Sequence, residues 1–183
     1  MNLNDSAVAI DVRVKQAKAL ATDKNPKAVD ILLTGLDSRS EPLRAAIIAS
    51  LKAQKGDVVL LQRAADTKRP AADRAAALAG IRVIKPADGG PKLGLLLVDK
   101  EEQVREAAAH ALCVVGTAAA EANLVAALKA ESSAKVRYFL ATALGELKTP
   151  AAKQAVTTQL KTEADFATKD ALEQSQAKQN RPL

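Results

Sequence analysis

Apolar residues recur along the chain at two fixed distances from a set of evenly spaced arginines. The arginines are Arg13, Arg44, Arg74, Arg105 and Arg137. Four positions after them stand Ala17, Ile48, Leu78, Ala109 and Ala141, and seven positions after them stand Leu20, Leu51, Ile81, Leu112 and Leu144. Because offsets of four and seven fall on one face of an α-helix, the pattern predicts an amphipathic helix at each arginine.

The distance from one arginine to the next is nearly constant. The four intervals are 31, 30, 31 and 32 residues, and Lys169 follows Arg137 after another 32. A fixed period of this length is typical of proteins built from repeated helical hairpins. The sequence therefore predicts about five copies of one structural unit and the beginning of a sixth.

A second apolar pair in most repeats predicts the second helix of each hairpin. The pairs are Leu32 and Leu36, Leu93 and Leu97, Leu124 and Leu128, and Val156 and Leu160, while the second repeat has Leu60 and Leu61 at an earlier position. Segments rich in glycine, proline, asparagine and aspartate, such as residues 85–91, separate the two helices and predict turns.

Two stretches resemble a known repeat family. Residues 104–112, which read Val-Arg-Glu-Ala-Ala-Ala-His-Ala-Leu, and residues 136–145 are similar to the short HEAT-like repeat of the phycobilisome-lyase type. The resemblance covers about residues 11–172. It implies an all-α fold, a right-handed α-α superhelix (HEAT-like solenoid) of about five helix pairs plus a C-terminal capping helix. The first helices would lie outside and the second helices would line the concave face.

These boundaries predict one domain over residues 1–173. The expected repeats are residues 8–37, 38–66, 67–98, 99–131 and 132–163, followed by a cap over residues 164–173. Residues 174–183 are polar and show no apolar period, so we expect a flexible tail there.

The amino-acid composition limits the classes of function that we expect. Only 2% of the residues are aromatic and the net charge is +6, with 15 basic and 10 acidic residues in positions 1–90 against 12 and 11 in the remainder. The basic first half leaves non-specific nucleic-acid binding as an alternative, although a chain without Trp is poorly suited to stacking on bases. We find no membrane-spanning run and no signal peptide, and expect a cytoplasmic protein.

The residues that usually carry catalysis are scarce. His110 is the only histidine and Cys113 the only cysteine, so a catalytic triad or a multi-ligand metal site cannot be assembled. We expect Cys113 to be a buried apolar residue. The predictions are therefore no enzyme activity, no metal and no cofactor.

The arginine column has two interpretations, a binding surface for anions or a structural ladder. Acidic residues stand six to eight positions before four of the arginines: Asp37 before Arg44, Asp66 before Arg74, Asp99 before Arg105 and Glu131 before Arg137. An arginine in the first turn of a helix can bind such a carboxylate or the carbonyl groups of the preceding loop. We therefore favour a structural ladder made of Arg13, Arg44, Arg74, Arg105 and Arg137.

The leading functional hypothesis is a non-catalytic scaffold or adaptor that binds another protein through the concave face. The candidate binding residues are polar positions of the second helices: Thr34, Lys92, Asn123, Lys129, Thr158 and Lys161. The resemblance leaves a bilin lyase, or an accessory factor for a tetrapyrrole-bearing protein, as an alternative. The identity of the partner, the pathway and the oligomeric state stay open.

Overall fold

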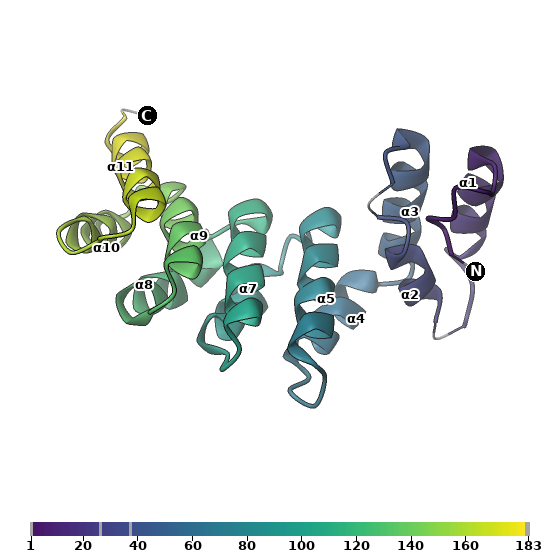
Figure 1. The fold of residues 1–183 in the computed structure, drawn as a ribbon, viewed down its shortest axis with the longest axis horizontal. Coiled ribbons are helices and arrows are strands. Elements are labelled where there is room, and N and C mark those ends of the chain that lie inside the picture. The colour runs from purple at the N-terminus through teal and green to yellow at the C-terminus, as the bar shows by residue number, and fades with distance from the viewer. Residues whose placement is uncertain (1, 26, 37, 182–183) are drawn as a thin grey trace. The chain divides into compact units, whose positions relative to one another are not determined.

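The computed structural model describes residues 2–25, 27–36 and 38–181, and no strand occurs among them. Eleven α-helices and two short 3-10 helices make up the fold of these residues (Figure 1). In chain order they are α1 (Ile10–Ala19), α2 (Ala28–Leu33), α3 (Glu41–Ala53), α4 (Gly56–Ala65), α5 (Ala71–Ile84), α6 (Gly90–Leu95), η1 (Leu96–Val98), α7 (Glu102–Val115), η2 (Ala118–Ala120), α8 (Glu121–Ala130), α9 (Ala134–Gly145), α10 (Pro150–Leu160) and α11 (Phe166–Asn180).

The helices follow the predicted order of five hairpins and a final helix. Each of α1, α3, α5, α7 and α9 is followed by the second helix of its pair, and α11 stands alone at the end. The prediction of an all-α repeat fold with a C-terminal helix is confirmed. The right-handed sense of the superhelix stays a prediction.

The helices fall into two compact units, residues 1–62 and residues 63–183. The single repeat domain over residues 1–173 stays a prediction. In the first unit α1 and α3 pack side by side and α2 packs against α3 (Figure 1). The amide of Gln54 donates hydrogen bonds of 2.6 Å to the carbonyl oxygens of both Leu20 and Asp23. These bonds tie the end of α3 to the end of α1.

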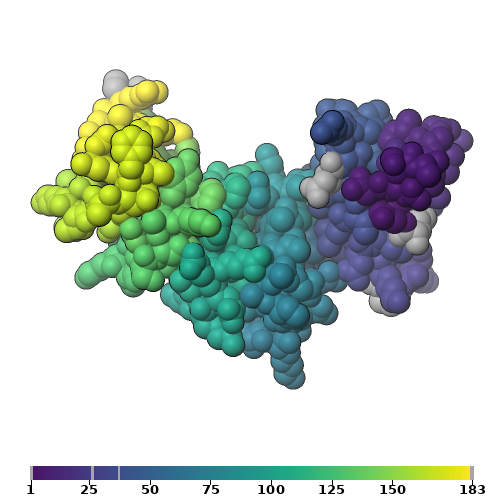
Figure 2. Space-filling view, viewed as in Figure 1, coloured from purple at the N-terminus to yellow at the C-terminus, as the bar shows by residue number. Residues whose placement is uncertain are grey.

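The second unit consists of two layers. The first-helix layer is α5, α7, α9 and α11, in which each helix packs against the next, and Figure 2 shows the side chains of α9 and α11 in contact (green to yellow). The second-helix layer is α6 with η1, then α8, then α10, again in contact in that order. The core lies between the layers, where Leu78, Leu112 and Leu144 face Leu93, Leu124 and Val156, all fully buried.

The predicted core positions are buried with few exceptions. Nine of the ten residues at offsets four and seven from an arginine are at most 3% exposed: Ala17, Leu20, Leu51, Leu78, Ile81, Ala109, Leu112, Ala141 and Leu144. The tenth, Ile48, is half-buried because its neighbour Ile47 occupies the core instead. Leu36 and Leu160, at the ends of second helices, are also half-buried.

The predicted flexible tail over residues 174–183 is wrong for residues 174–180. These residues continue α11 to Asn180, and Ser175 and Gln179 are buried against α9. Ser175 Oγ donates a hydrogen bond of 2.9 Å to the carbonyl oxygen of Ala141, and Gln179 Nε2 donates one of 2.9 Å to that of Leu144. The packing face of this helix end is polar, so the search for an apolar period missed it. Residues 182–183 lie outside the described residues.

Among the described residues, every helix is too short or too polar to cross a lipid bilayer.

Candidate interaction surface

Three arginines of the second unit each join one repeat to the next. Arg105 Nε and Nη2 donate to the two carboxylate oxygens of Glu131 at 2.7 and 3.0 Å, and Arg137 makes the same pair of bonds with Glu163, both at 2.7 Å. Arg74 binds both carboxylate oxygens of Asp99. Bidentate pairs of this kind are among the stronger hydrogen-bonded contacts in proteins.

The same guanidinium groups also bind backbone carbonyl groups ahead of their own helix, in the preceding loop for Arg105 and Arg137 and in the last turn of α4 for Arg74. Arg105 Nη1 donates to the carbonyl oxygen of Asp99 at 2.9 Å, Arg137 Nη1 donates to that of Ser132 at 2.7 Å, and Arg74 Nε donates to that of Ala64 at 2.8 Å. Arg105 and Arg137 therefore each contact two successive inter-repeat loops, and Arg74 contacts the end of α4 and the loop that carries Asp99. The contacts run from residue 64 to residue 163 within the second unit.

The carboxylates of these pairs are held in their charged form. The bonds from Arg137 lower the pKa of Glu163 to about 2. Burial is the largest influence on Asp99 and Glu131 and acts against their charge. The bonds from Arg74 and Arg105, together with backbone N–H bonds and the nearby positive charges, outweigh it, so that the pKa of each carboxyl lies below its ordinary value. The pairs stay ionised at neutral pH.

The predicted carboxylate partners of these arginines are wrong by one repeat. The carboxylate of Asp99 binds Arg74 and that of Glu131 binds Arg105, whereas Asp66 pairs with Arg69. Glu131 accepts a hydrogen bond of 2.9 Å from the backbone N–H of Ser133, two residues further on. Its carboxylate also binds Arg105, which belongs to the preceding repeat. Asp37, the predicted partner of Arg44, lies outside the described residues.

The arginines of the first unit bind carbonyl groups. Arg44 Nη1 donates to the carbonyl oxygen of Ser38 at 2.6 Å, and Arg13 Nη1 donates to that of Leu3 at 3.5 Å. Arg44 also pairs with Glu41 in the same helix at 3.2 Å. These bonds anchor the loop in front of each helix.

The structure places the six candidate binding residues on second helices or at their ends. Thr34 is in the first unit, where its hydroxyl accepts the N–H of Leu3 at 3.0 Å. Asn123 is half-buried against Gly94, since a Cβ on that glycine would lie 3.0 Å from Asn123 Oδ1. The other four are exposed on the second-helix layer of the second unit: Lys92, Lys129, Thr158 and Lys161. The assignment of this layer to a concave face stays a prediction.

A groove of about 320 Å³ lies between α8 and α10, and it brings two of these candidates together. Its lining consists of Val125, Leu128, Lys129, Ala151, Gln154, Ala155, Thr158 and Gln159. Small and apolar side chains dominate the floor, and a single charged group, the Lys129 ammonium, lies in it. The groove is therefore shaped to accept apolar side chains next to an anion.

A second groove lies on the other side of α8. Its lining combines apolar side chains with charged and polar ones: Leu97, Val98, Ala126, Ala127, Ala130, Asp99, Arg105, Glu131 and Ser132. The exposed fraction of Val98 is 78%, and that of Leu95, three positions earlier, is 69%. Sequence reasoning missed both residues. The signal is the apolar run Leu95-Leu96-Leu97-Val98, of which only Leu96 and Leu97 are buried.

The comparisons with known proteins agree with this arrangement. A family model described as HEAT repeats matches residues 90–177. This segment is similar to HEAT repeats. The matched segment contains all of the second-helix layer and both grooves. The phycobilisome-lyase subtype of the HEAT family stays a prediction.

A solved structure shows the same fold along nearly the whole chain. It is a crystal structure of an engineered protein from the Northeast Structural Genomics Consortium, similar to this chain with a TM-score of 0.51 over 95% of this chain and 92% of that one. The sequence identity is 19%, so the likeness concerns the fold alone. A comparison with curated proteins found no match.

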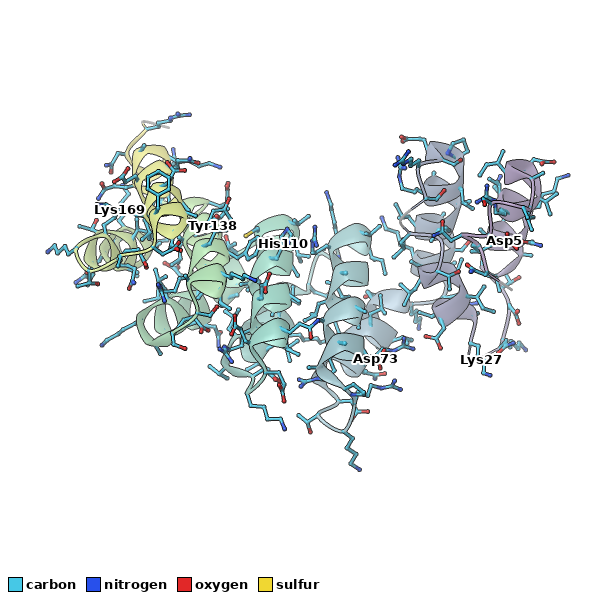
Figure 3. All side chains as sticks on the ribbon, in the orientation of Figure 1. Asp5, Lys27, Asp73, His110, Tyr138 and Lys169 are labelled. Atoms are coloured by element: carbon cyan, nitrogen blue, oxygen red, sulfur yellow. The ribbon has the colours of Figure 1, made fainter. Side chains whose placement is uncertain are left out.

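Three ring side chains of the second unit lie in the first-helix layer. The His110 ring on α7 stacks on Phe139 of α9 with 4.3 Å between the ring centroids, and Tyr138 meets the edge of Phe139. Figure 3 labels His110 on α7 and Tyr138 on α9. Burial, together with the nearby positive charge of Arg82, lowers the pKa of His110. His110 is thus an uncharged packing group at neutral pH.

Cys113 is half-buried between the same two helices. Its thiol donates to the carbonyl oxygens of Ala109 and Phe139 at 3.4 and 3.3 Å, and burial raises the pKa of the thiol to about 12. The side chain therefore stays a thiol at neutral pH, which makes it a poor nucleophile. Within the described ranges, no three His, Cys, Asp or Glu side chains are grouped as metal ligands would be.

Proposed function

We propose that this protein is a non-catalytic scaffold or adaptor that binds another protein through the second-helix layer of its second unit. The observation that carries the proposal is the high exposure of Leu95 and Val98, the second of which lines a groove. Large aliphatic side chains gathered on one surface are typical of protein-binding sites. A HEAT-repeat fold over residues 90–177 is consistent with a protein-interaction role.

The arrangement of the arginine pairs supports this role. Arg74, Arg105 and Arg137 bind successive loops at one end of the hairpins, so we propose that they act as a structural ladder that keeps α6, α8 and α10 in register. A surface held in one geometry loses less conformational entropy when it binds a partner. We also place the protein in the cytoplasm and expect it to work without a cofactor.

Affinity capture with matched variants tests the proposal. The binding variant is Leu95→Asp with Val98→Asp, and the control variant is Tyr138→Asp with Phe166→Asp, which changes two exposed side chains of the first-helix layer by the same charge. Both variants should keep the helical circular-dichroism spectrum because the changed side chains are exposed. We expect the binding variant to lose the captured partner and the control to retain it. Loss of the partner only with the control would overturn the proposal.

A further inference from the structure

The lysines of the second-helix layer carry unbalanced positive charge. Lys92, Lys129 and Lys161 are exposed, and within the part of the chain that the structure describes no carboxylate lies at ion-pair distance from any of them. They stand on α6, on α8 and directly after α10. Each of the three α-helices of this layer therefore carries one of these lysines or is followed directly by one.

Two of the acidic groups next to these helices are paired with arginines, and Asp88, before α6, is exposed. Glu121 accepts a hydrogen bond from the hydroxyl of Thr149. Glu131 and Glu163, which follow α8 and α10, have side chains only 4% and 0% exposed and pair with Arg105 and Arg137. Glu121 keeps its charge in its bond with Thr149, but Lys92, Lys129 and Lys161 outnumber Glu121 and Asp88, so the net charge of these groups is positive.

The floor of the α8–α10 groove is suited to apolar side chains. Ala151 is exposed, Val125 and Ala155 are half-buried, and Leu128 closes the bottom of the groove. Lys129 lies in the groove itself, and Lys161 follows Thr158, a lining residue, by three positions along the chain. An apolar channel bordered by lysines is complementary to a segment with apolar residues on one face and carboxylates on the other.

We propose that the α8–α10 groove binds an acidic amphipathic segment of a partner protein. The apolar side chains of the segment lie on Val125, Leu128, Ala151 and Ala155, and its carboxylates pair with Lys129 and Lys161. This proposal rests on the proposed function, because it names the partner chemistry for the same helix layer.

A nucleic acid fits this layer less well than an acidic peptide. Single-stranded nucleic acids bind through aromatic side chains on which the bases stack and through arginine and lysine contacts to phosphate. Tyr138 and Phe139 belong to the first-helix layer, and the guanidinium groups of Arg105 and Arg137 are occupied by carboxylates. The groove thus offers apolar contacts where a nucleic acid would need stacking surfaces.

The test is selection of a phage-displayed library of random peptides on the immobilised full chain, followed by affinity measurements on the enriched peptides. We expect enriched sequences that combine glutamate or aspartate with apolar residues at helical spacing. The groove variant Lys129→Glu with Lys161→Glu should bind these peptides at least about tenfold more weakly. The control, Lys135→Glu with Lys169→Glu on the first-helix layer, makes the same charge change at two exposed lysines and should bind as the unmodified chain does.

The outcomes separate this inference from the proposed function. Enrichment of neutral or basic peptides whose binding depends on Leu95 and Val98 would overturn the proposal of an acidic ligand. It would leave the proposal of a protein-binding surface intact. Acidic peptides that are weakened only by the Lys135/Lys169 control would overturn both. Failure to enrich any peptide overturns the acidic ligand, as would a single-stranded oligonucleotide that binds the groove more tightly than the selected peptides.

Discussion

At the scale of single residues, the pairing with Arg137 strongly lowers the pKa of the Glu163 carboxyl. The carboxylate side chain is fully buried, accepts two bonds from the guanidinium group and a third from Gln159 at 3.0 Å, and has a pKa of about 2. In the unfolded chain the same group titrates near 4.5. Because its pKa is lower in the folded state, the pair stabilises the fold above pH 4.5 and loses this effect as the pH falls toward 2.

The variant Glu163→Gln measures this contribution. At pH 7 we expect it to lower the free energy of unfolding by roughly 3 kcal/mol, since it leaves the Arg137 charge without a counter-ion. Urea denaturation at a series of pH values gives the measurement. The gap between the variant and the unmodified chain should close between pH 4.5 and pH 2, while the exposed control Glu173→Gln should show little effect at any pH. A gap that is independent of pH would contradict the assignment.

At the scale of helices, the contact between α9 and α11 depends on a glycine. A Cβ at Gly145 would lie 2.5 Å from Ser175 Oγ and 3.0 Å from Ser175 Cα, so any larger residue forces the two helices apart. Ser175 also donates its hydroxyl to the Ala141 carbonyl of α9. The close approach and the hydrogen bond together keep the C-terminal helix in place.

Replacement of Gly145 by alanine should therefore destabilise the protein by about 1–3 kcal/mol, despite the better helix propensity of alanine. Thermal unfolding followed by circular dichroism checks this. Gly90→Ala is the matched control, because the nearest atom to its Cβ would be 3.4 Å away, and we expect it to be tolerated. Equal melting temperatures for the two variants would show that α11 does not pack on α9 in this way.

The elements that the sequence predicted well are those whose signal is local. The helices follow from apolar residues at offsets of four and seven, and Leu78, Leu112 and Leu144 are buried as predicted. The carboxylate partner of Arg105 could not be predicted because one acidic residue, Asp99, precedes it and another, Glu131, follows it. Only the packing of the loops selects Glu131. Ser175 and Gln179 were missed because a polar face can pack when its hydrogen bonds are satisfied.

The candidate site was predicted less completely than the fold. Lys92, Lys129, Thr158 and Lys161 are exposed on the expected helices, so the helical period sufficed to place them on the second-helix layer. The grooves and the exposure of Leu95 and Val98 depend on the distance between neighbouring second helices. That distance is a tertiary property with no local signal in the sequence.

At the scale of the whole molecule, the bidentate arginine pairs are confined to the second unit among the described residues. Asp99, Glu131 and Glu163 stand 25 or 26 positions after Arg74, Arg105 and Arg137. At the same distance after Arg44 the sequence has Arg69 and Pro70, and no carboxylate. The pairs therefore provide a repeated stabilising contact inside residues 63–183.

We expect a fragment of residues 63–183 to fold without the first unit. Its core is formed by its own two layers, and its three bidentate pairs lie inside the fragment. The fragment should show cooperative thermal unfolding and a dispersed amide NMR spectrum. A fragment that is unfolded or aggregated would mean that the first unit supplies contacts that the second requires.

Hydrogen–deuterium exchange of the full chain, with and without its captured partner, tests the central claim most directly. The account predicts that the partner slows amide exchange in residues 90–98, 121–130 and 150–160, which form the second-helix layer, and leaves residues 102–115 and 134–145 unchanged. Slower exchange confined to those first helices would contradict it.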